Sequence, residues 1–456
     1  MKRQWVLCIV CVALLVVSCD FQPAASLSVN APVPPVVVEE EVRQGAWTFI
    51  VYMAADNNLE TAAIADFNEL ESVAFSDDVT VLVLFDRAQG NDATNDDWTD
   101  TRLFKVAHDN DNTLALVSER LDCPELGLTA DAMTELDMAQ TTVLSSLLAY
   151  AARAFPADHY GLIMWGHGTG WRGNDDVGLP ELTRAFALDD ASATYMTIAE
   201  LRAGIENGLH ALSVPVLDCI GFDTCFGICL ETAYELRSSA QFLMGTPALV
   251  PANGWDYARL FSQFLAGEKT PLAFAQCALE QYQAQYATYE YAAFSVVDCA
   301  QVESVAVSFN AFAREMADGV ADTEIRKAVT TLLQETCVRY CADTFPTDCY
   351  VDVYSFAHHL GAAYASVADK AQKVVDAVQD AVPIRWEKKG RNDACGMGVF
   401  YIAYQSQGIP SYSHDSLYIN NSRRSGQCQF VLDCAGYVPT ATTAGSLLDM
   451  LFYYQF

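Results

Sequence analysis

The chain has 456 residues, 52% of them hydrophobic, and its 58 acidic against 26 basic residues give a formal net charge of −32. This length allows two domains or one elaborated domain, and the apolar content excludes a disordered chain. The charge argues against nucleic acid as a partner, because few cations are present to neutralise phosphates. It would favour Lys- or Arg-rich peptides, although an acidic excess is also ordinary for a solvated surface.

The N-terminus has the pattern of an export signal, predicted for residues 1–18. Two basic residues precede an apolar stretch at residues 5–17, which is too short to span a bilayer comfortably. Cys19 directly follows a small residue, as in a bacterial lipobox, and would then be lipidated; the alternative is an ordinary signal peptide with an incidental cysteine. Residues 19–45 are rich in proline and valine, which predicts an extended tether. We therefore expect an exported bacterial lipoprotein, periplasmic or on the cell surface, anchored in a membrane.

Buried strands and amphipathic helices alternate along the rest of the chain. Apolar runs predict strands at residues 47–56, 79–86, 101–107, 159–166, 216–225, 242–249, 291–299 and 397–404, and periodicity predicts helices at 59–74, 137–154, 196–209 and 226–240. Thr197 is the expected N-cap of the third of these helices. The alternation predicts an α/β fold with a largely parallel central sheet flanked by helices on both faces. We expect this core at residues 46–257 and a C-terminal α+β subdomain at 258–456.

Cysteine usage agrees with export. Of fifteen cysteines, Cys8 and Cys11 would leave with the signal. Six others gather late in the chain: Cys337, Cys341, Cys349, Cys395, Cys428 and Cys434. Disulfides within the C-terminal part are expected in an oxidising compartment, with no pairing assigned. Zinc is the competing interpretation, but the cluster has no C-x-x-C spacing.

Two reactive side chains follow predicted strands. His167 lies between Gly166 and Gly168 at the end of one strand, and Cys225 lies where the next core strand gives way to a helix. Sites in parallel sheets form at the carboxyl ends of the strands. A cysteine at a helix start would have a lowered pKa, and a nearby imidazole could activate it and protonate a leaving amine. Alone, such a histidine is usually structural and such a cysteine usually part of a core or a disulfide.

Several segments together resemble the clostripain family of cysteine endopeptidases, which share the caspase–haemoglobinase fold. They are "WTFIVYMAADNNLE", "HYGLIMWGHGTGW", "GFDTCFGICLETAYEL", "PANGWDY" and "AAFSVVDC", between residues 47 and about 404. The resemblance implies a catalytic dyad of His167 and Cys225, with the backbone amides of Gly168 and Cys225 as oxyanion donors and no third orienting residue assigned. It also implies cleavage after Arg or Lys.

The resemblance further implies an acidic S1 pocket. Asp223, two residues before the nucleophile, matches its carboxylate and would pair with a guanidinium; the alternative is an Asx turn that shapes the Cys225 loop. The "PANGWDY" loop would form another wall, lined by Trp255. Asn253 stands where some relatives have an acid, which puts strict arginine preference in doubt unless Asp256 compensates.

Two further properties of relatives bear on the segment between the two motifs. Some relatives cut themselves there, and Arg172 and Arg184 lie in "WRGNDDVGLPELTRAFALDD"; Arg184 is our candidate. Some depend on calcium, for which Asp175, Asp176, Asp189 and Asp190 offer oxygen ligands. No spacing matches a defined calcium loop, so calcium is allowed but not required and no metal ligand is assigned.

The sequence thus predicts an exported, lipid-anchored, monomeric cysteine endopeptidase that acts on peptides or proteins with basic residues. The alternative is an inactive surface lipoprotein that binds peptides or host proteins through the same cleft. An inert relative would typically have lost His167 or Cys225, and both are present.

Overall fold

The computed structural model describes residues 45–110, 113–171, 186–212, 214–289, 292–319, 328–329, 331–333, 335–340, 348–388 and 393–402. All of them belong to one compact unit. The predicted signal at 1–18, nearly all of the tether, Cys19, Arg172, Arg184, Asp175 and Asp176 lie outside the described residues. Within those residues, no helix has the length and apolar character needed to cross a bilayer.

A nine-stranded sheet forms the centre of this unit, in the order β13-β10-β9-β8-β5-β1-β2-β3-β4. Its strands are β1 (Gly45–Ala55), β2 (Val79–Arg87), β3 (Thr101–Lys105), β4 (Glu119–Arg120), β5 (Ala157–Trp165), β8 (Leu217–Asp223), β9 (Ala240–Gly245), β10 (Ala293–Asp298) and β13 (Ile384–Glu387). The five central strands, from β9 to β2, are parallel to one another. At each edge, the last two strands pair antiparallel with their neighbours. The prediction of a largely parallel α/β sheet is confirmed.

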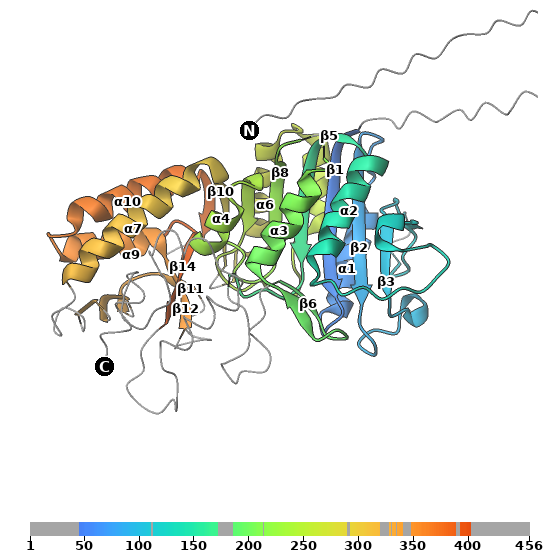
Figure 1. Cartoon of the computed structure of the whole chain (residues 1–456), viewed down its shortest axis with the longest axis horizontal. Helices are drawn as coiled ribbons and strands as arrows, with labels where there is room; N and C mark the ends of the chain where they lie inside the picture. Colours follow the sequence, from blue (N-terminus) through green and yellow to red (C-terminus); the bar gives the residue numbers. More distant parts are fainter. Residues whose placement is uncertain are drawn as a thin grey trace, which may run out of the picture. The chain divides into compact units, whose positions relative to one another are not determined.

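Helices cover both faces of the sheet. One face carries α2 (Thr141–Ala154), α3 (Ile198–Leu209) and α4 (Leu230–Leu236), and the other carries α1 (Glu60–Glu71), α5 (Tyr257–Ala266) and α6 (Pro271–Tyr286). Figure 1 shows α2 and α3 lying across the first of these faces. Successive side chains of β1 point to opposite faces, so Ile50 and Tyr52 pack in one core and Phe49 and Val51 in the other. This double burial is why the strand is apolar throughout.

The chain beyond residue 257 adds two strands to the large sheet and forms a further group of helices with a small second sheet. Strands β10 and β13 complete one edge of the sheet. Helices α7 (Val302–Gly319), α9 (Val353–Ala363) and α10 (Ala368–Ala381) follow, with a small antiparallel sheet of β11 (Arg339–Tyr340), β12 (Asp348–Asp352) and β14 (Gly398–Ile402). Cys337 and Cys395 are buried free thiols here. The other four cysteines for which disulfides were expected have side chains outside the described residues.

Local structure departs from expectation in two places near the sheet edge. A hairpin of β6 (Phe186–Asp189) and β7 (Thr194–Met196) forms where no strand was expected. Helix α4 begins only at Leu230, whereas we expected a helix from residue 226. By contrast, Thr197 caps α3 as expected, and it forms a capping box with Glu200.

Candidate active site

His167 and Cys225 leave the sheet side by side. Strands β5 and β8 are parallel neighbours in which Trp165 lies opposite Asp223, so each reactive residue follows two positions after a paired one. The amide of Gly166 donates to the carbonyl of Asp223 at 3.3 Å, which extends the pairing past the last strand residues. The register therefore places the two predicted catalytic residues next to each other, at the carboxyl ends of two neighbouring strands.

Gly168 packs directly against the turn that holds Cys225. A Cβ at this position would lie 2.6 Å from the carbonyl oxygen of Cys225 and 2.7 Å from Cβ of Thr224. Only glycine permits this approach. Within the described part of the chain, no backbone carbonyl accepts the amide hydrogen of Gly168 or of Cys225, and the amide of Cys225 faces its own thiol. Two backbone donors are thus available beside the thiol, as an oxyanion hole requires.

The half-buried ring of His167 contacts Asn58, which lies in the turn after β1. Its Nε2 lies 2.7 Å from Oδ1 of Asn58. An amide oxygen accepts, so Nε2 carries the hydrogen and the lone pair lies on Nδ1. We assigned no orienting residue from the sequence; the available signal was the pair of asparagines directly after the buried run at 47–56.

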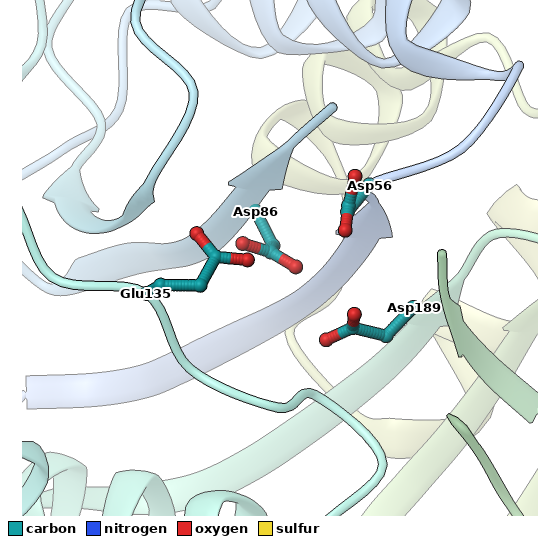
Figure 2. A group of neighbouring side chains, drawn as sticks. All are labelled: Asp56, Asp86, Glu135 and Asp189. Carbon is teal, nitrogen blue, oxygen red and sulfur yellow. The ribbon is translucent and has the colours of Figure 1, made fainter. Parts of the chain in front are cut away.

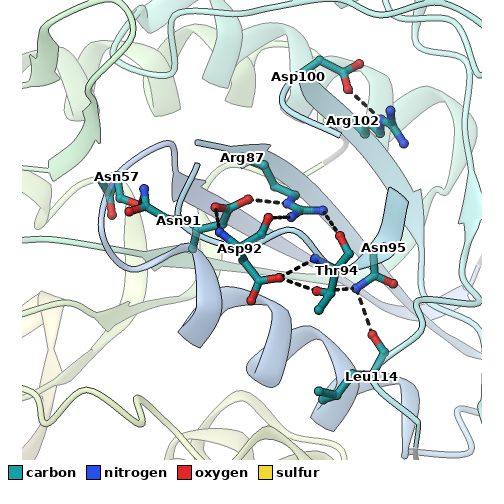
Figure 3. Close-up of polar contacts among 10 residues, drawn as sticks. Asn57, Arg87, Asn91, Asp92, Thr94, Asn95, Asp100, Arg102 and Leu114 are labelled. Carbon is teal, nitrogen blue, oxygen red and sulfur yellow. Dashed lines mark hydrogen bonds and ion pairs between the residues drawn. The ribbon is translucent and has the colours of Figure 1, made fainter. Parts of the chain in front are cut away.

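A loop network holds the segment that contains Asn58. Arg87, fully buried at the end of β2, pairs with Glu60 at 2.6 Å and donates to the backbone of Asp92. Asn91 in the same loop donates to the carbonyl of Asn57 at 3.1 Å (Figure 3). The side chain of Asn57 in turn donates to the carbonyl of Leu188 in β6. The turn after β1 is therefore fixed between the β2 loop and the β6–β7 hairpin.

The environment of Cys225 differs from the one expected. The residue lies in a turn in which Phe226 has φ of +57° and donates its amide to Ala248, and helix α4 with its N-cap Cys229 begins well beyond. No helix terminus therefore acts on the thiol, and the prediction of a lowered pKa is wrong. Burial raises the pKa of Cys225 to about 11, although the amide of Val250 lies 3.3 Å from Sγ. Ionisation then depends on transfer of the proton to a base.

Tyr350 of β12 joins the two reactive loops from the other side. Its hydroxyl donates to the carbonyl of Thr169 at 2.7 Å, and its ring lies 5.1 Å from that of Phe226. A Cβ on Gly170 would collide with the same hydroxyl. One buried side chain from the small sheet thus braces both the histidine loop and the cysteine turn.

Asp223 is buried and only partly satisfied. It is 4% exposed; its Oδ2 accepts from the amide of Trp255 at 3.0 Å and from the hydroxyl of Tyr257 at 3.1 Å. Its Oδ1 has no hydrogen-bond partner among the described residues. These bonds reach across to the "PANGWDY" loop and none closes a local Asx turn. Desolvation raises the pKa of Asp223 to about 7.

Two acids from α1 lie in the same buried region. A Cβ on Gly254 would lie 2.8 Å from both Oδ2 of Asp223 and Oδ2 of Asp66. Asp66 accepts from Nε1 of Trp165, and Glu69 accepts from the amide of Tyr257. No described lysine or arginine pairs with any of the three acids. Desolvation raises the pKa of Glu69 to about 7 and holds that of Asp66 well above its usual range.

The loop residues expected in this region divide into two groups. The ring of Trp255 is buried against Gly221 and Phe294, next to the acids. Asn253 is exposed, and Asp256 is the N-cap of α5 and pairs with Arg259. Two carboxyl groups near Asp223 come from α1 instead of from position 253, which no local pattern indicated.

A second acidic group lies at the carboxyl ends of β1 and β2. Oxygen atoms of Asp56, Asp86, Glu135 and Asp189 lie within 4.8 Å of one another, an arrangement that could hold a metal ion (Figure 2). Of the aspartates weighed from sequence as calcium ligands, the structure describes Asp189 and Asp190, and Asp189 belongs to this group. The amide of Asp190 instead donates to the carbonyl of Asp56.

Comparisons with known proteins identify the family and structures of similar fold. The sequence profile of the clostripain family matches residues 51–428. Clostripain of Hathewaya histolytica is 29% identical over 233 residues, which span 49% of this chain and 43% of that protein. The fold is similar to that of an inactive zymogen C11 protease from Parabacteroides distasonis (TM-score 0.59, 17% identity, 86% of this chain and 99% of that one). It is also similar to a secreted C11 cysteine protease from Bacteroides thetaiotaomicron, solved with an irreversible peptide inhibitor (TM-score 0.54, 16% identity, 84% and 99%).

Proposed function

Since the chain belongs to the clostripain family of cysteine peptidases, we propose that it is an exported endopeptidase that cleaves after arginine or lysine with a dyad of Cys225 and His167. The observation that supports the dyad most directly is the pairing of Trp165 with Asp223, which brings both residues to adjoining strand ends. The amides of Gly168 and Cys225, which no described backbone carbonyl accepts, support the same proposal.

The chemistry follows from these positions. Nδ1 of His167 accepts the proton of Cys225, and the thiolate attacks the carbonyl carbon of the scissile peptide bond. The amides of Gly168 and Cys225 donate to the oxyanion. As the C–N bond breaks, the imidazolium returns its proton to the leaving amine. Water, deprotonated by the same ring, then hydrolyses the thioester and regenerates the thiol.

The buried acids support a preference for a basic P1 side chain. Asp223 has an unpartnered oxygen, and Asp66 and Glu69 add two further carboxyl groups, none of which pairs with a described lysine or arginine. Burial holds the pKa values of Asp66 and Glu69 high, and a bound cation would favour their charged forms. A guanidinium or ammonium that entered this region would gain charge-assisted bonds in a water-poor setting. In this proposal Asp223 binds the P1 cation directly and Trp255 forms the wall beside it. Asn253, being exposed, contributes at most to the rim.

Three parts of the proposal concern residues outside the described ones or the whole chain. Cys19 would anchor the mature protein to a membrane, Arg184 would be the site of self-cleavage, and the protein would act as a monomer. Mass spectrometry of the membrane fraction tests the first through a diacylglyceryl mass on the peptide that begins at Cys19. N-terminal sequencing of the purified chain tests the second, because cleavage after Arg184 creates a new terminus at Ala185.

The test of the proposed function uses the chain from residue 20 and fluorogenic peptides with Arg, Lys, Asp, Asn or Leu at P1. We expect cleavage after Arg or Lys, lost in both Cys225→Ala and His167→Ala. Asp223→Asn should lower kcat/KM for the Arg peptide by about 10- to 150-fold, equivalent to ~1.5–3 kcal/mol for a hydrogen bond to a charged group. Asp256→Asn, which keeps the N-cap of α5, is the matched control. Cleavage after Leu alone would refute the basic pocket and leave the dyad intact.

A binding protein with an inert cleft is the second candidate, and the raised pKa of Cys225 is the observation that suits it. A thiol-directed peptidyl probe separates the two. An active dyad reacts with it stoichiometrically and His167→Ala abolishes the labelling, whereas an inert thiol reacts equally slowly in both chains.

A further inference from the structure

The chain that follows β9 runs in the opposite direction beside the turn that holds Cys225. The amide of Phe226 donates to the carbonyl of Ala248 at 2.8 Å, and the amide of Ile228 donates to the carbonyl of Thr246 at 3.1 Å. Residue numbers rise on one side as they fall on the other, which is the order of antiparallel pairing. These bonds hold the two segments together, so the next residues along each segment also lie close to each other.

Val250 continues this arrangement, but its amide meets a sulfur atom where a ladder would offer a carbonyl. The nitrogen of Val250 lies 3.3 Å from Sγ of Cys225, and the carbonyl oxygen of Val250 lies 4.0 Å from the same atom. A backbone amide donates and cannot accept, whereas a carbonyl accepts and cannot donate. The closer contact therefore favours the thiolate, which is the stronger acceptor, and the longer contact would serve only the neutral thiol.

We propose that the backbone amide of Val250 is a catalytic group that stabilises the thiolate of Cys225 before it attacks the peptide bond. This step rests on the proposed function, because it takes Cys225 as the nucleophile. When Nδ1 of His167 takes the proton of the thiol, the negative charge stays on Sγ and the amide of Val250 donates to it. When the S–C bond forms, the charge passes to the carbonyl oxygen of the substrate, to which the amides of Gly168 and Cys225 donate. Successive positions of the charge thus have separate donors.

The thiolate needs such a donor because its surroundings otherwise oppose it. Burial raises the pKa of Cys225 to about 11, and the charge of Asp223 acts in the same direction. Of the contacts that lower this pKa, the amide of Val250 has the largest effect, ahead of the residue's own amide. Helix α4 begins only at Leu230, so no helix terminus takes this role. Loss of the contact with Val250 should therefore make the thiolate harder to form.

Both groups of the contact are held in place. Phe226, next to Cys225, has φ of +57°, a left-handed conformation that bulky residues rarely adopt. The bond from its amide to the chain after β9 and the packing of its ring on Tyr350, at 5.1 Å, maintain this conformation. On the other side, Pro251 directly follows Val250 and restricts it to extended backbone. The donor and the sulfur therefore meet without further ordering of either segment.

The test removes this one hydrogen and leaves the side chains in place. Cell-free translation can insert 2-hydroxy-3-methylbutanoic acid, the hydroxy analogue of valine, at position 250, which turns the amide between Leu249 and Val250 into an ester without an N–H. The His167→Ala chain is the background, so that the imidazole does not contribute. The rate of alkylation of Cys225 by iodoacetamide near pH 8 is followed by mass spectrometry of the peptide that contains this residue, because the thiolate is the reactive form.

We expect the ester to lower this rate by about 3- to 15-fold. A hydrogen bond to a charged group is equivalent to about one to two pKa units, and the smaller thiolate fraction is partly offset by the greater nucleophilicity of a more basic thiolate. An ester at the exposed Asn253 is the matched control for the backbone change, and Val250→Ala, which keeps the N–H, is the control for the side chain. Both should react at the rate of the His167→Ala chain. An unchanged rate with the ester at position 250 would overturn the proposal.

Pro251→Ala is a second variant, and it keeps every backbone amide. It frees Val250 from the restriction that proline imposes, so alkylation should slow by a smaller factor. An unchanged rate would refute the part that Pro251 plays in holding the donor.

Peptide cleavage separates this proposal from the proposed function. In the chain that keeps His167, the ester at position 250 should lower kcat/KM for the Arg peptide. In the Cys225→Ala chain it should leave the Kd of the peptide unchanged, because the sulfur is then absent; a weaker Kd would show that the amide binds substrate instead and would overturn the proposal. If the chain with His167 cleaved no peptide while the ester still slowed alkylation, the proposed function would fail and the role of the amide would stand.

Discussion

Replacement of Gly168 by alanine tests the close packing of the two reactive loops. The added Cβ would lie 2.6 Å from the carbonyl oxygen of Cys225 and 2.7 Å from Thr224. Both contacts involve backbone or a short side chain, so neither can rotate away. The φ of Gly168 is not in the left-handed region, and the perturbation is therefore purely steric.

The size of the effect follows from the displacement needed. An ordinary contact of 3.4 Å requires the loops to separate by about 0.8 Å in an interior that is otherwise close-packed. Overpacking of this kind costs about 1–3 kcal/mol of the free energy of unfolding. A misplacement of about 1 Å between reacting groups lowers the rate by about 10²-fold. We therefore expect kcat to fall about 100-fold while the protein stays folded.

The assay measures kcat and KM with an arginine peptide, and Tm by calorimetry. Gly267→Ala is the matched control, because its Cβ would meet nothing closer than 3.5 Å; its kcat should match the parent value. Gly168→Ala with parental kcat would show that the loops are loosely packed and would refute the geometry on which the oxyanion hole rests.

Three further predictions concern the same chain. Because Asp223 and Glu69 have pKa values raised to about 7 and are neutral below it, the ratio of kcat/KM for Arg over Leu peptides should rise as the pH increases through 7; a flat ratio would argue against a role for these acids. Asn58→Ala should lower kcat by about 2- to 10-fold with KM unchanged, since it removes the bond to His167; steady-state kinetics of the parent and this variant would decide this. Thr197→Ala should lower the free energy of unfolding by about 1 kcal/mol through loss of the α3 cap and leave kcat unchanged, as measured by urea denaturation and peptide cleavage.

The parallel core was predictable because its strands are buried on both faces. Runs such as residues 79–86 have no polar alternation, and β2 indeed places all but one of its residues in the interior. The proximity of His167 and Cys225 was predictable because each follows such a run, and neighbouring parallel strands end on the same side of a sheet. In these cases the signal is local and continuous in sequence.

Features that depend on distant contacts were missed or misjudged. The strands of the β6–β7 hairpin are short and lie among polar residues, so they gave no periodic signal. The expected helix start at residue 226 is wrong because Phe226 instead donates its amide to Ala248, which lies beyond the next strand.

The two acidic groups were missed for the same reason. One combines Asp66 and Glu69 of α1 with Asp223, more than 150 positions away by residue number. The other draws its carboxylates from four separate parts of the chain. No motif within a single segment encodes either group, so only the fold brings their members together.

The contact of Tyr350 with Thr169 spans 181 positions of the chain, and this separation determines how late in synthesis the contact can form. A chain emerging from a ribosome or an export channel would present His167 and Cys225 long before Tyr350 could reach them. The loops that hold the dyad would gain their brace only when most of the protein had been made. An endopeptidase built in this order would be inactive for most of its synthesis and transport, which would protect the machinery that delivers it.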